Sequence, residues 1–244
     1  MLVQLNSRCG YLPHSSETDR PCLGYVRGER HTLLIDAGNS PAHHALMLRE
    51  MARAGLPAPT LTAITHSHWD HTYGMCAATG PVLVNDATQA HLTAMSAWAW
   101  TLPAMEARLA TGEDILFCHE CILKEYPDLS AIRVRPGDVT YHGRLTVDLG
   151  GIHAELIHLD NSHADDCSVV YVPEEKLLFL GDILCCDLHH DPCCLHQARF
   201  AALRRGLEAL DFTLAVEGHG DPLTREQVFA DMDEHLTEDI LLLP

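Results

Sequence analysis

The sequence is short of positive charge. Its 244 residues include 16 lysines and arginines against 34 aspartates and glutamates, which gives a formal net charge of −18 at pH 7. A field of this sign repels a phosphate backbone, so we expect no nucleic-acid partner. The 18 histidines could reduce this charge as the pH falls toward 6, or they could serve as metal ligands.

The sequence also lacks long apolar runs. No stretch approaches the roughly 20 apolar residues that a helix needs to span a bilayer. The N-terminus has no basic start followed by an apolar run, which argues against a secretory signal. These absences predict a cytoplasmic protein with no membrane partner, in which the ten cysteines are reduced thiols rather than a disulfide framework.

No internal repeat, low-complexity tract or Gly/Ser linker divides the chain, so we expect one domain over residues 1–244. Apolar residues make up 47% of the sequence, which argues against disorder. Each half of the chain contains short β-like runs followed by helical patterns. This arrangement predicts an α/β fold in which two sheets pack face to face with helices outside.

Two helical segments matter for the later argument. Ser40 and Pro41 resemble the N-cap and first-turn proline of a helix over residues 42–55, with His43 and His44 on its surface. Residues 86–110 also look helical and apolar, include Trp98 and Trp100, and form part of a helical insertion around 86–130. This segment could cover a site as a lid, although ordinary packing is favoured, and its apolar surface could form a homodimer contact.

The densest polar cluster follows the β-like run "LTAIT". The sequence "HSHWDH" places His66, His68, Asp70 and His71 within six consecutive positions. Side chains at i and i+2 of an extended loop point the same way, so His66 and His68 can reach one ion together. A turn could aim Asp70 and His71 at a second ion. Imidazole nitrogen and carboxylate oxygen suit Zn²⁺, whereas the alternative is a solvated polar loop.

Three further donors favour the metal hypothesis over the polar loop. His163, Asp182 and His219 each occur in turn-like surroundings at or near the end of a β-like run. Glycine stands beside Asp182 and on both sides of His219, where it lets the backbone come close to a ligand. The chain therefore offers enough donors to complete a closed site.

With these residues the sequence resembles the metallo-β-lactamase-fold hydrolase superfamily, in particular its glyoxalase II-like and lactonase-like branch. The resemblance rests on the H-x-H-x-D-H run, His163, the "GD" at 181–182 and the "GHG" at 218–220, and it spans almost the whole chain. It implies an αββα sandwich of two mixed β-sheets. It further implies a first ion on His66, His68 and His163, a second ion on Asp70, His71 and His219, and a bridging Asp182. Asp36 matches a position that supports the ligand loop.

The chemistry implied by such a site is hydrolysis. Two divalent ions that share a bridging water lower its pKa and supply hydroxide as the nucleophile. Zn²⁺ is the first choice, although Fe or Mn could occupy the same ligands. Asp70 would orient the hydroxide as well as bind metal. The substrate class that we expect is a small thioester, a lactone or a related ester.

Other branches of the superfamily fit less well but stay open. Zinc β-lactamases usually carry cysteine at the position of Asp182, and flavodiiron proteins carry an acid at the position of His68. Nuclease branches conflict with the net charge of −18. The alternatives are an iron-dependent sulfur dioxygenase-like redox enzyme, or a β-lactamase or phosphodiesterase-type hydrolase of the same fold.

The residues that would contact substrate are harder to identify. Trp69 and Tyr73 flank the ligands and could line the pocket or pack beneath it, and His189 and His190 could lie on its rim. His189 and His190 belong to the Cys/His-rich segment 182–197. A structural role of this segment is favoured over a third metal site, because its two pairs of adjacent cysteines cannot easily converge on one ion. The C-x-x-C pair formed by Cys118 and Cys121 is interpreted as two free thiols.

Overall fold

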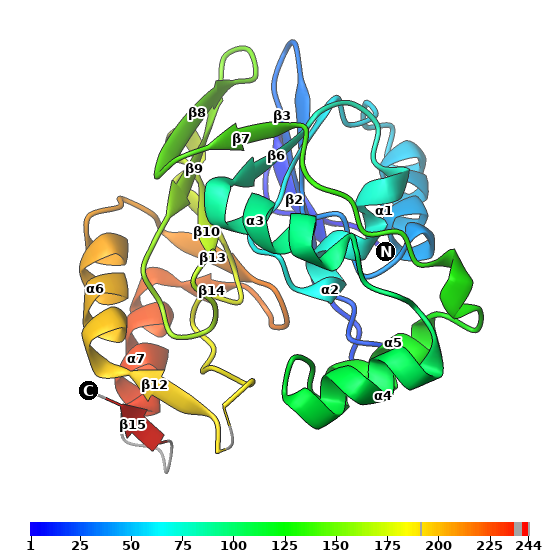
Figure 1. Ribbon diagram of the computed structural model, residues 1–244. Helices are drawn as coiled ribbons and strands as arrows, with labels where there is room; N and C mark the ends of the chain where they lie inside the picture. Colours follow the sequence, from blue (N-terminus) through cyan, green and yellow to red (C-terminus); the bar gives the residue numbers. More distant parts are fainter. Residues whose placement is uncertain (191, 237–240, 244) are drawn as a thin grey trace.

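The computed structural model describes residues 1–190, 192–236 and 241–243, and it contains two large β-sheets that pack face to face (Figure 1). The first sheet has its strands in sequence order, antiparallel from β1 to β4 and parallel from β4 to β7. Its strands are β1 (Val3–Gln4), β2 (Cys9–Leu12), β3 (Leu23–Arg27), β4 (Thr32–Ile35), β5 (Leu61–Ala63), β6 (Val82–Asn85) and β7 (Val139–Tyr141).

The second sheet has the strand order β14-β13-β11-β10-β9-β8. Its neighbours are antiparallel except for β11 and β13, which run parallel, so both sheets are mixed. Its strands are β8 (Arg144–Asp148), β9 (His153–His158), β10 (Ser168–Val172), β11 (Leu177–Gly181), β13 (Leu214–Glu217) and β14 (Leu223–Thr224). A separate parallel pair is formed by β12 (Cys194–His196) and β15 (Leu241–Leu243).

The core lies between the two sheets. Leu33 and Ile35 of β4 pack in one buried cluster with Leu156 of β9, Val170 of β10 and Phe179 of β11. In a strand, alternate side chains point to the same face, so each sheet presents one apolar face to the other. The opposite faces need separate cover.

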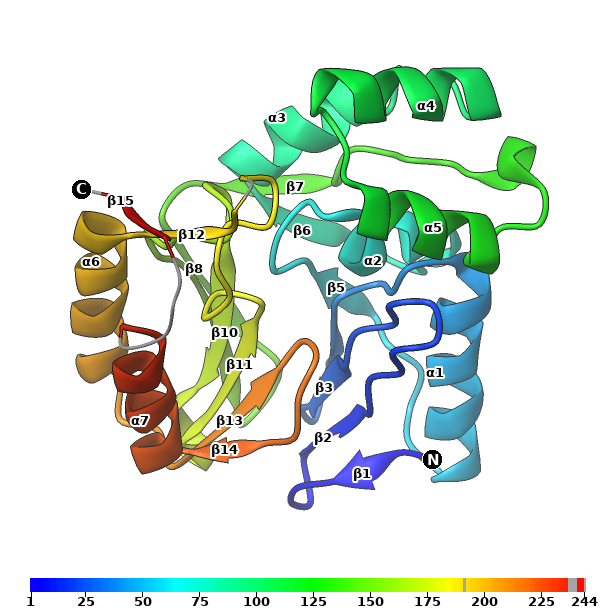
Figure 2. The ribbon, with the colours of Figure 1, turned by 90° about the horizontal axis from the view of Figure 1, so that it is seen from below.

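Helices supply that cover, as Figure 2 shows with α1 on one side and α6 and α7 on the other. Met47 and Met51 of α1 pack against the first sheet, and Phe200 and Leu203 of α6 pack against the second. The predicted αββα sandwich is confirmed. The helices are α1 (Pro41–Arg53), α2 (Trp69–Thr72), α3 (Asp86–Met95), α4 (Leu102–Thr111), α5 (Leu116–Glu125), α6 (Gln197–Glu208) and α7 (Arg225–His235), with 3₁₀ turns η1 (Tyr73–Ala77), η2 (Leu129–Ala131) and η3 (Pro173–Glu175).

Helix α1 begins as predicted but buries two residues that were expected at the surface. The Ser40 hydroxyl accepts from the backbone N–H of His43, and Pro41 occupies the first turn. The prediction that His43 and His44 are surface residues is wrong, because their side chains are 1% and 2% exposed. His43 lies one turn before Met47 on the helix face that packs inward.

The helical segment that precedes β7 is interrupted. The residues 86–110 that were expected to be helical form two separate helices, α3 and α4, and the Thr101 hydroxyl caps the second. Trp98 and Trp100 lie in the connection between them, where both rings contact the guanidinium of Arg108. No helix within the described residues is long and apolar enough to cross a membrane.

Candidate metal centre

The predicted donors lie at one end of the sandwich, where strands of both sheets stop. The parallel neighbours β4 and β5 end just before Asp36 and the loop with His66, and the parallel neighbours β11 and β13 end at Gly181 and just before His219. Carboxyl ends of parallel strands meet at the same edge of a sheet. The amide of Ser168 donates to the carbonyl of Thr65 at 2.7 Å, which ties the two sheets together beside the site.

Three histidines form the first cluster. The donor atoms of His66, His68 and His163 all lie within 4.8 Å of one another. Nε2 of His163 is 3.0 Å from Nδ1 of His68, and the His66 ring centroid lies 4.6 Å and 5.1 Å from those of the other two rings. This spacing lets the three side chains reach a common ion.

Two carboxylates and two histidines form the second cluster, which comprises Asp70, His71, Asp182 and His219. His68 precedes the single helical turn α2, and this turn carries Asp70 and His71 toward the second cluster. Oδ2 of Asp70 lies 3.1 Å from Nε2 of His71 and 3.0 Å from Nε2 of His219. All seven predicted ligand side chains are therefore close together.

Asp182 lies between the clusters. Its Oδ2 is 3.3 Å from Nε2 of His71 and 3.4 Å from Nε2 of His219, and it is 3.8 Å from Nε2 of His163 in the first cluster. In the described part of the chain, Nε2 of His66 and Oδ1 of Asp182 are buried without a hydrogen-bond partner. A buried polar atom without a partner is costly, and a cation would satisfy both atoms. The donor set thus fits divalent metal.

Glycine provides room for this carboxylate. A Cβ at Gly218 would come within 1.9 Å of Oδ1 of Asp182, so a larger residue there would collide with it. The amide of Gly218 donates to the carbonyl of Gly181 at 2.9 Å, which aligns the two ligand turns. Gly181 itself has φ +56°, a left-handed conformation that glycine adopts readily.

Asp36 supports the ligand loop, as the family resemblance implied. Its Oδ1 accepts from the amide of Thr65 at 2.8 Å, and its Oδ2 accepts from Nδ1 of His71 at 2.8 Å. A carboxylate that accepts from Nδ1 fixes the ring so that Nε2 faces the centre. The Thr65 hydroxyl also lies 3.1 Å from Nδ1 of His66.

Two more ligand rings have partners on their outward nitrogens. Nδ1 of His163 donates to the carbonyl of Cys186 at 3.2 Å. Nδ1 of His219 lies 3.6 Å from a carboxylate oxygen of Asp19, which the sequence did not point to. Asp19 lies in the polar loop between β2 and β3, and nothing in that loop's sequence distinguishes it from an ordinary surface turn.

The two clusters differ in their electrostatics. Burial lowers the pKa of His66 well below its ordinary value and that of His68 to about 3, so these rings are neutral and ready to bind metal. In the second cluster, burial works against the charged His219 ring, but Asp182 and Asp70 outweigh it and raise its pKa to about 11. Metal binding at the second cluster therefore releases protons.

A cavity of about 330 Å³ opens directly above the clusters. Donor residues of both clusters line it, together with residues from the loop before β3, from α5 and from the segment after Asp182. Its lining is His14, Ser16, Asp19, His68, Asp70, Ile115, Phe117, Cys118, His163, Asp182, Cys185, Leu188, His189 and His219.

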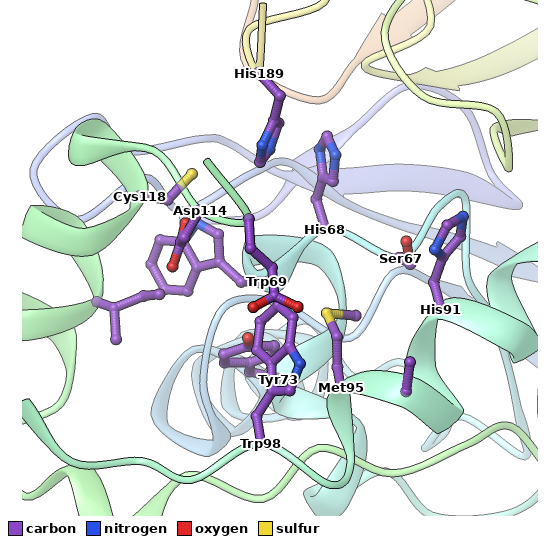
Figure 3. Close-up of a pocket in the computed structure, with 13 residues that line it drawn as sticks. Ser67, His68, Trp69, Tyr73, His91, Met95, Trp98, Asp114, Cys118 and His189 are labelled. Carbon is purple, nitrogen blue, oxygen red and sulfur yellow. The ribbon is translucent and has the colours of Figure 1, made fainter. Parts of the chain in front are cut away.

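A second cavity of about 370 Å³ adjoins the first and shares His68, Cys118 and His189 with it. Trp69 and Tyr73 line this second cavity and also pack on each other (Figure 3). Lining the pocket and packing beside the ligands, which the sequence left as alternatives, are therefore both observed. His190 was expected on the rim, but it is exposed and lines neither cavity.

Cysteines near the site have different surroundings. Cys118 lines both cavities, and burial raises the pKa of its thiol. Cys121 is buried in the cluster that contains Trp69 and Tyr73. The donor atoms of Asp187, Cys194 and His196 also lie close together. An additional metal site in the 182–197 segment therefore stays an alternative. Asp191, which belongs to that segment, lies outside the described residues.

Comparisons with known proteins agree with this geometry. The family model described as "Metallo-beta-lactamase superfamily" matches residues 23–211. A search of curated proteins finds no match. Similar solved structures include a metallo-beta-lactamase from Pontibacter korlensis, with a TM-score of 0.69, 17% identity and coverage of 98% of this chain and 99% of that chain.

Two further structures share the fold. A metallo-beta-lactamase from Hirschia baltica has a TM-score of 0.63 and 15% identity over 96% of each chain. A stereoselective inverting sec-alkylsulfatase from Pseudomonas sp. has a TM-score of 0.69 and 14% identity, covering 96% of this chain and 41% of that chain. At such identities the likeness concerns the fold and does not transfer a substrate.

Proposed function

Because the chain belongs to the metallo-beta-lactamase superfamily, we propose that it is a metal-dependent hydrolase of a small thioester, a lactone or a related ester. We propose two divalent ions, with Zn²⁺ as the first choice and Fe or Mn as alternatives. His66, His68 and His163 would hold the first ion, and Asp70, His71 and His219 would hold the second. Asp182 would contact both.

The observation that carries this proposal is the position of Asp182. One carboxylate oxygen lies within 3.8 Å of ligand nitrogens from both clusters, while the other is buried without a partner in the described part of the chain. When bound, two such ions would lower the pKa of a water between them and polarise the oxygen of the scissile bond. A carboxylate with two oxygens is suited to contact both ions.

The protein's own groups would orient the reactants. Asp70 lines the cavity above the clusters, and His71 and His219 hold its pKa below the usual range although burial opposes ionisation. Its carboxylate is therefore available to accept a hydrogen bond from the attacking water. His189 lines both cavities and could donate to the substrate. The second cavity would accommodate the part of the substrate that does not react.

A β-lactam is a second candidate substrate, since two of the similar structures are metallo-beta-lactamases. The composition of the cavities disfavours an anionic substrate. Among the described residues, neither cavity is lined by lysine or arginine. The carboxylate that β-lactams carry would thus find no cationic side chain to pair with.

Hydrolysis by reconstituted protein tests the proposal. Metal-free protein is loaded separately with Zn²⁺, Mn²⁺ or Fe²⁺ and assayed with a glutathione thioester, an acyl-homoserine lactone, a phosphodiester and a cephalosporin reporter. We expect metal-dependent cleavage of the acyl-homoserine lactone, which carries no carboxylate, to be faster than that of the glutathione thioester, which carries carboxylates. Oxygen uptake with one iron per chain and no hydrolysis would instead support the sulfur dioxygenase alternative.

The variant Asp182→Ala tests whether the carboxylate between the clusters is needed for metal binding and hydrolysis. We expect it to lose bound metal and to abolish hydrolysis, because it removes the group shared by the two clusters. Asp211→Ala is the matched control, since Asp211 is exposed and pairs with Lys176 at the surface. Normal activity of Asp182→Ala would refute the two-metal assignment.

A further inference from the structure

The second cavity has an aromatic and acidic lining. Figure 3 shows His68 and His189 at the end nearer the metal centre, Trp98 at the opposite end, and Trp69 and Tyr73 between them. The methionine Met95 and the carboxylates Glu113 and Asp114 also line this cavity. We call this space the aromatic–acidic cavity.

The two carboxylates come from the connection between α4 and α5. Asp114 is 8% exposed, whereas Glu113 is exposed. The hydrogen bond that Asp114 accepts comes from the next amide in the chain, that of Ile115 at 2.9 Å. Across the described residues neither carboxylate has an ion-pair partner. Two acids that line one cavity and have no ion-pair partner among the described residues favour a positively charged neighbour.

The cations around the cavity do not neutralise these acids. Arg108 has the largest electrostatic effect on Asp114, ahead of His189 and His119, but its guanidinium lies 4.5 Å and 4.8 Å from the ring centroids of Trp98 and Trp100. It does not line the cavity. His91 does line it, yet its Nε2 already pairs with Asp165 at 2.8 Å.

Aromatic faces strengthen the preference for positive charge. A cation within about 6 Å of an indole or phenol ring is attracted by the ring quadrupole, and the attraction grows when the cation is desolvated. Trp98 already contacts one cation, Arg108, at its ring. Trp69 and Tyr73 add two further rings to the wall.

We propose that the aromatic–acidic cavity selects an ester or thioester whose non-reacting part carries a positively charged nitrogen on an apolar body. This inference rests on the proposed hydrolase function, which places the scissile bond at the adjoining metal centre. Glu113 and Asp114 would be the residues that determine specificity. The reacting bond would extend past His68 and His189 into the first cavity, because both residues line the two cavities.

Three esters with the same acyl group test the charge preference. Their alcohols end in a trimethylammonium, a tert-butyl or a carboxylate group, so the first two have nearly the same shape. With metal-loaded protein, we expect the KM of the cationic ester to be roughly ten-fold or more below that of the neutral ester. Equal values, or the lowest KM for the anionic ester, would overturn the inference.

The acidic variants show whether these two residues cause the preference. Glu113→Gln and Asp114→Asn should each narrow the KM ratio between the neutral and the cationic ester. Glu120→Gln is the control, because Glu120 is exposed on α5 and lines neither cavity. An unchanged ratio in both variants would exclude the carboxylates as the determinants. Glu113 is exposed, so its variant should fold even if Asp114→Asn does not.

A binding measurement keeps this inference separate from the proposed function. Tetramethylammonium is titrated into the metal-free protein while tryptophan fluorescence is followed, to which Trp69 and Trp98 of the cavity and also Trp100 contribute. Neopentyl alcohol serves as the neutral analogue. Saturable quenching by the cation alone supports the cavity's preference even if no ester is hydrolysed. Equal or absent binding of the two probes refutes it even if hydrolysis occurs.

Discussion

The carboxylate of Asp36 lies 2.8 Å from Nδ1 of His71, and both side chains are almost fully buried. The same carboxylate accepts from the amide and the hydroxyl of Thr65, at the start of the ligand loop. It therefore orients a ligand ring and holds the loop that carries the other donors. Asp36 has φ +62°, a conformation that aspartate and asparagine adopt more readily than most residues.

The variant Asp36→Asn tests this support. Asparagine keeps the backbone conformation but cannot accept equally well at both oxygens, so the His71 ring loses its fixed orientation. We expect metal affinity to fall roughly 10- to 100-fold, measured by competition with a coloured chelator. Unchanged affinity would show that the pairing is not needed to hold the ligand.

The metal centre also requires space beside the Asp182 side chain. In Gly218→Ala the new Cβ would collide with the Asp182 carboxylate, so we expect lower metal content and a stability loss of roughly 1–3 kcal/mol. Gly220→Ala is the matched control on the other side of His219, since its Cβ would meet the flexible end of Glu217. Equal metal content in the two variants would contradict the steric argument.

Glu125 connects α5 to the loop that carries Asp19. Its carboxylate, 3% exposed, pairs with Arg20 at 2.8 Å and accepts from the hydroxyls of Thr18 and Ser40. We expect Glu125→Gln to lower the free energy of unfolding by roughly 2 kcal/mol, measured by urea denaturation. The exposed Glu120→Gln on the same helix should change it by less than about 0.5 kcal/mol. Similar losses in both variants would contradict the role of this network.

Buried His43 makes stability depend on pH. Burial lowers the pKa of His43 from 6.5 to about 3. Between these pH values the ring is therefore neutral in the folded state and protonated in the unfolded state. Stability is therefore retained above pH 6.5 and falls as the pH drops from 6.5 toward 3, by up to about 1.4 kcal/mol per pH unit.

The variant His43→Gln isolates this effect. The unfolding free energy of metal-free protein is measured by urea denaturation between pH 7 and pH 5, where the wild type should lose stability more steeply than His43→Gln. His31→Gln is the control, because His31 is exposed and its ring contacts the hydroxyl of Thr60 rather than a charged group. Parallel pH curves for wild type and His43→Gln would show that His43 does not carry the dependence.

Much of the centre could be predicted because its donors follow strand ends. Four donors lie within six consecutive positions, so their spacing alone assigns them to one site. Glycines mark the turns that carry Asp182 and His219. The topology then explains their meeting, since β11 and β13 are parallel neighbours. The αββα layer arrangement could be predicted as well, because each half of the chain contains strands followed by helices.

Other features depend on packing between distant segments. Nothing local distinguishes Asp19, and its place beside His219 arises from the docking of the loop before β3. The burial of His43 depends on which face of α1 meets the sheet, and two adjacent histidines gave the opposite indication. Glu113 and Asp114 reach the aromatic–acidic cavity only because the α4–α5 connection folds over it.

Anomalous X-ray scattering at the zinc edge, from crystals of zinc-loaded protein, tests the central claim most directly. We predict two peaks per chain, one among His66, His68 and His163 and the other among Asp70, His71 and His219, with Asp182 in contact with both. A single peak, or zinc bound only at Asp187, Cys194 and His196, would contradict the two-metal centre.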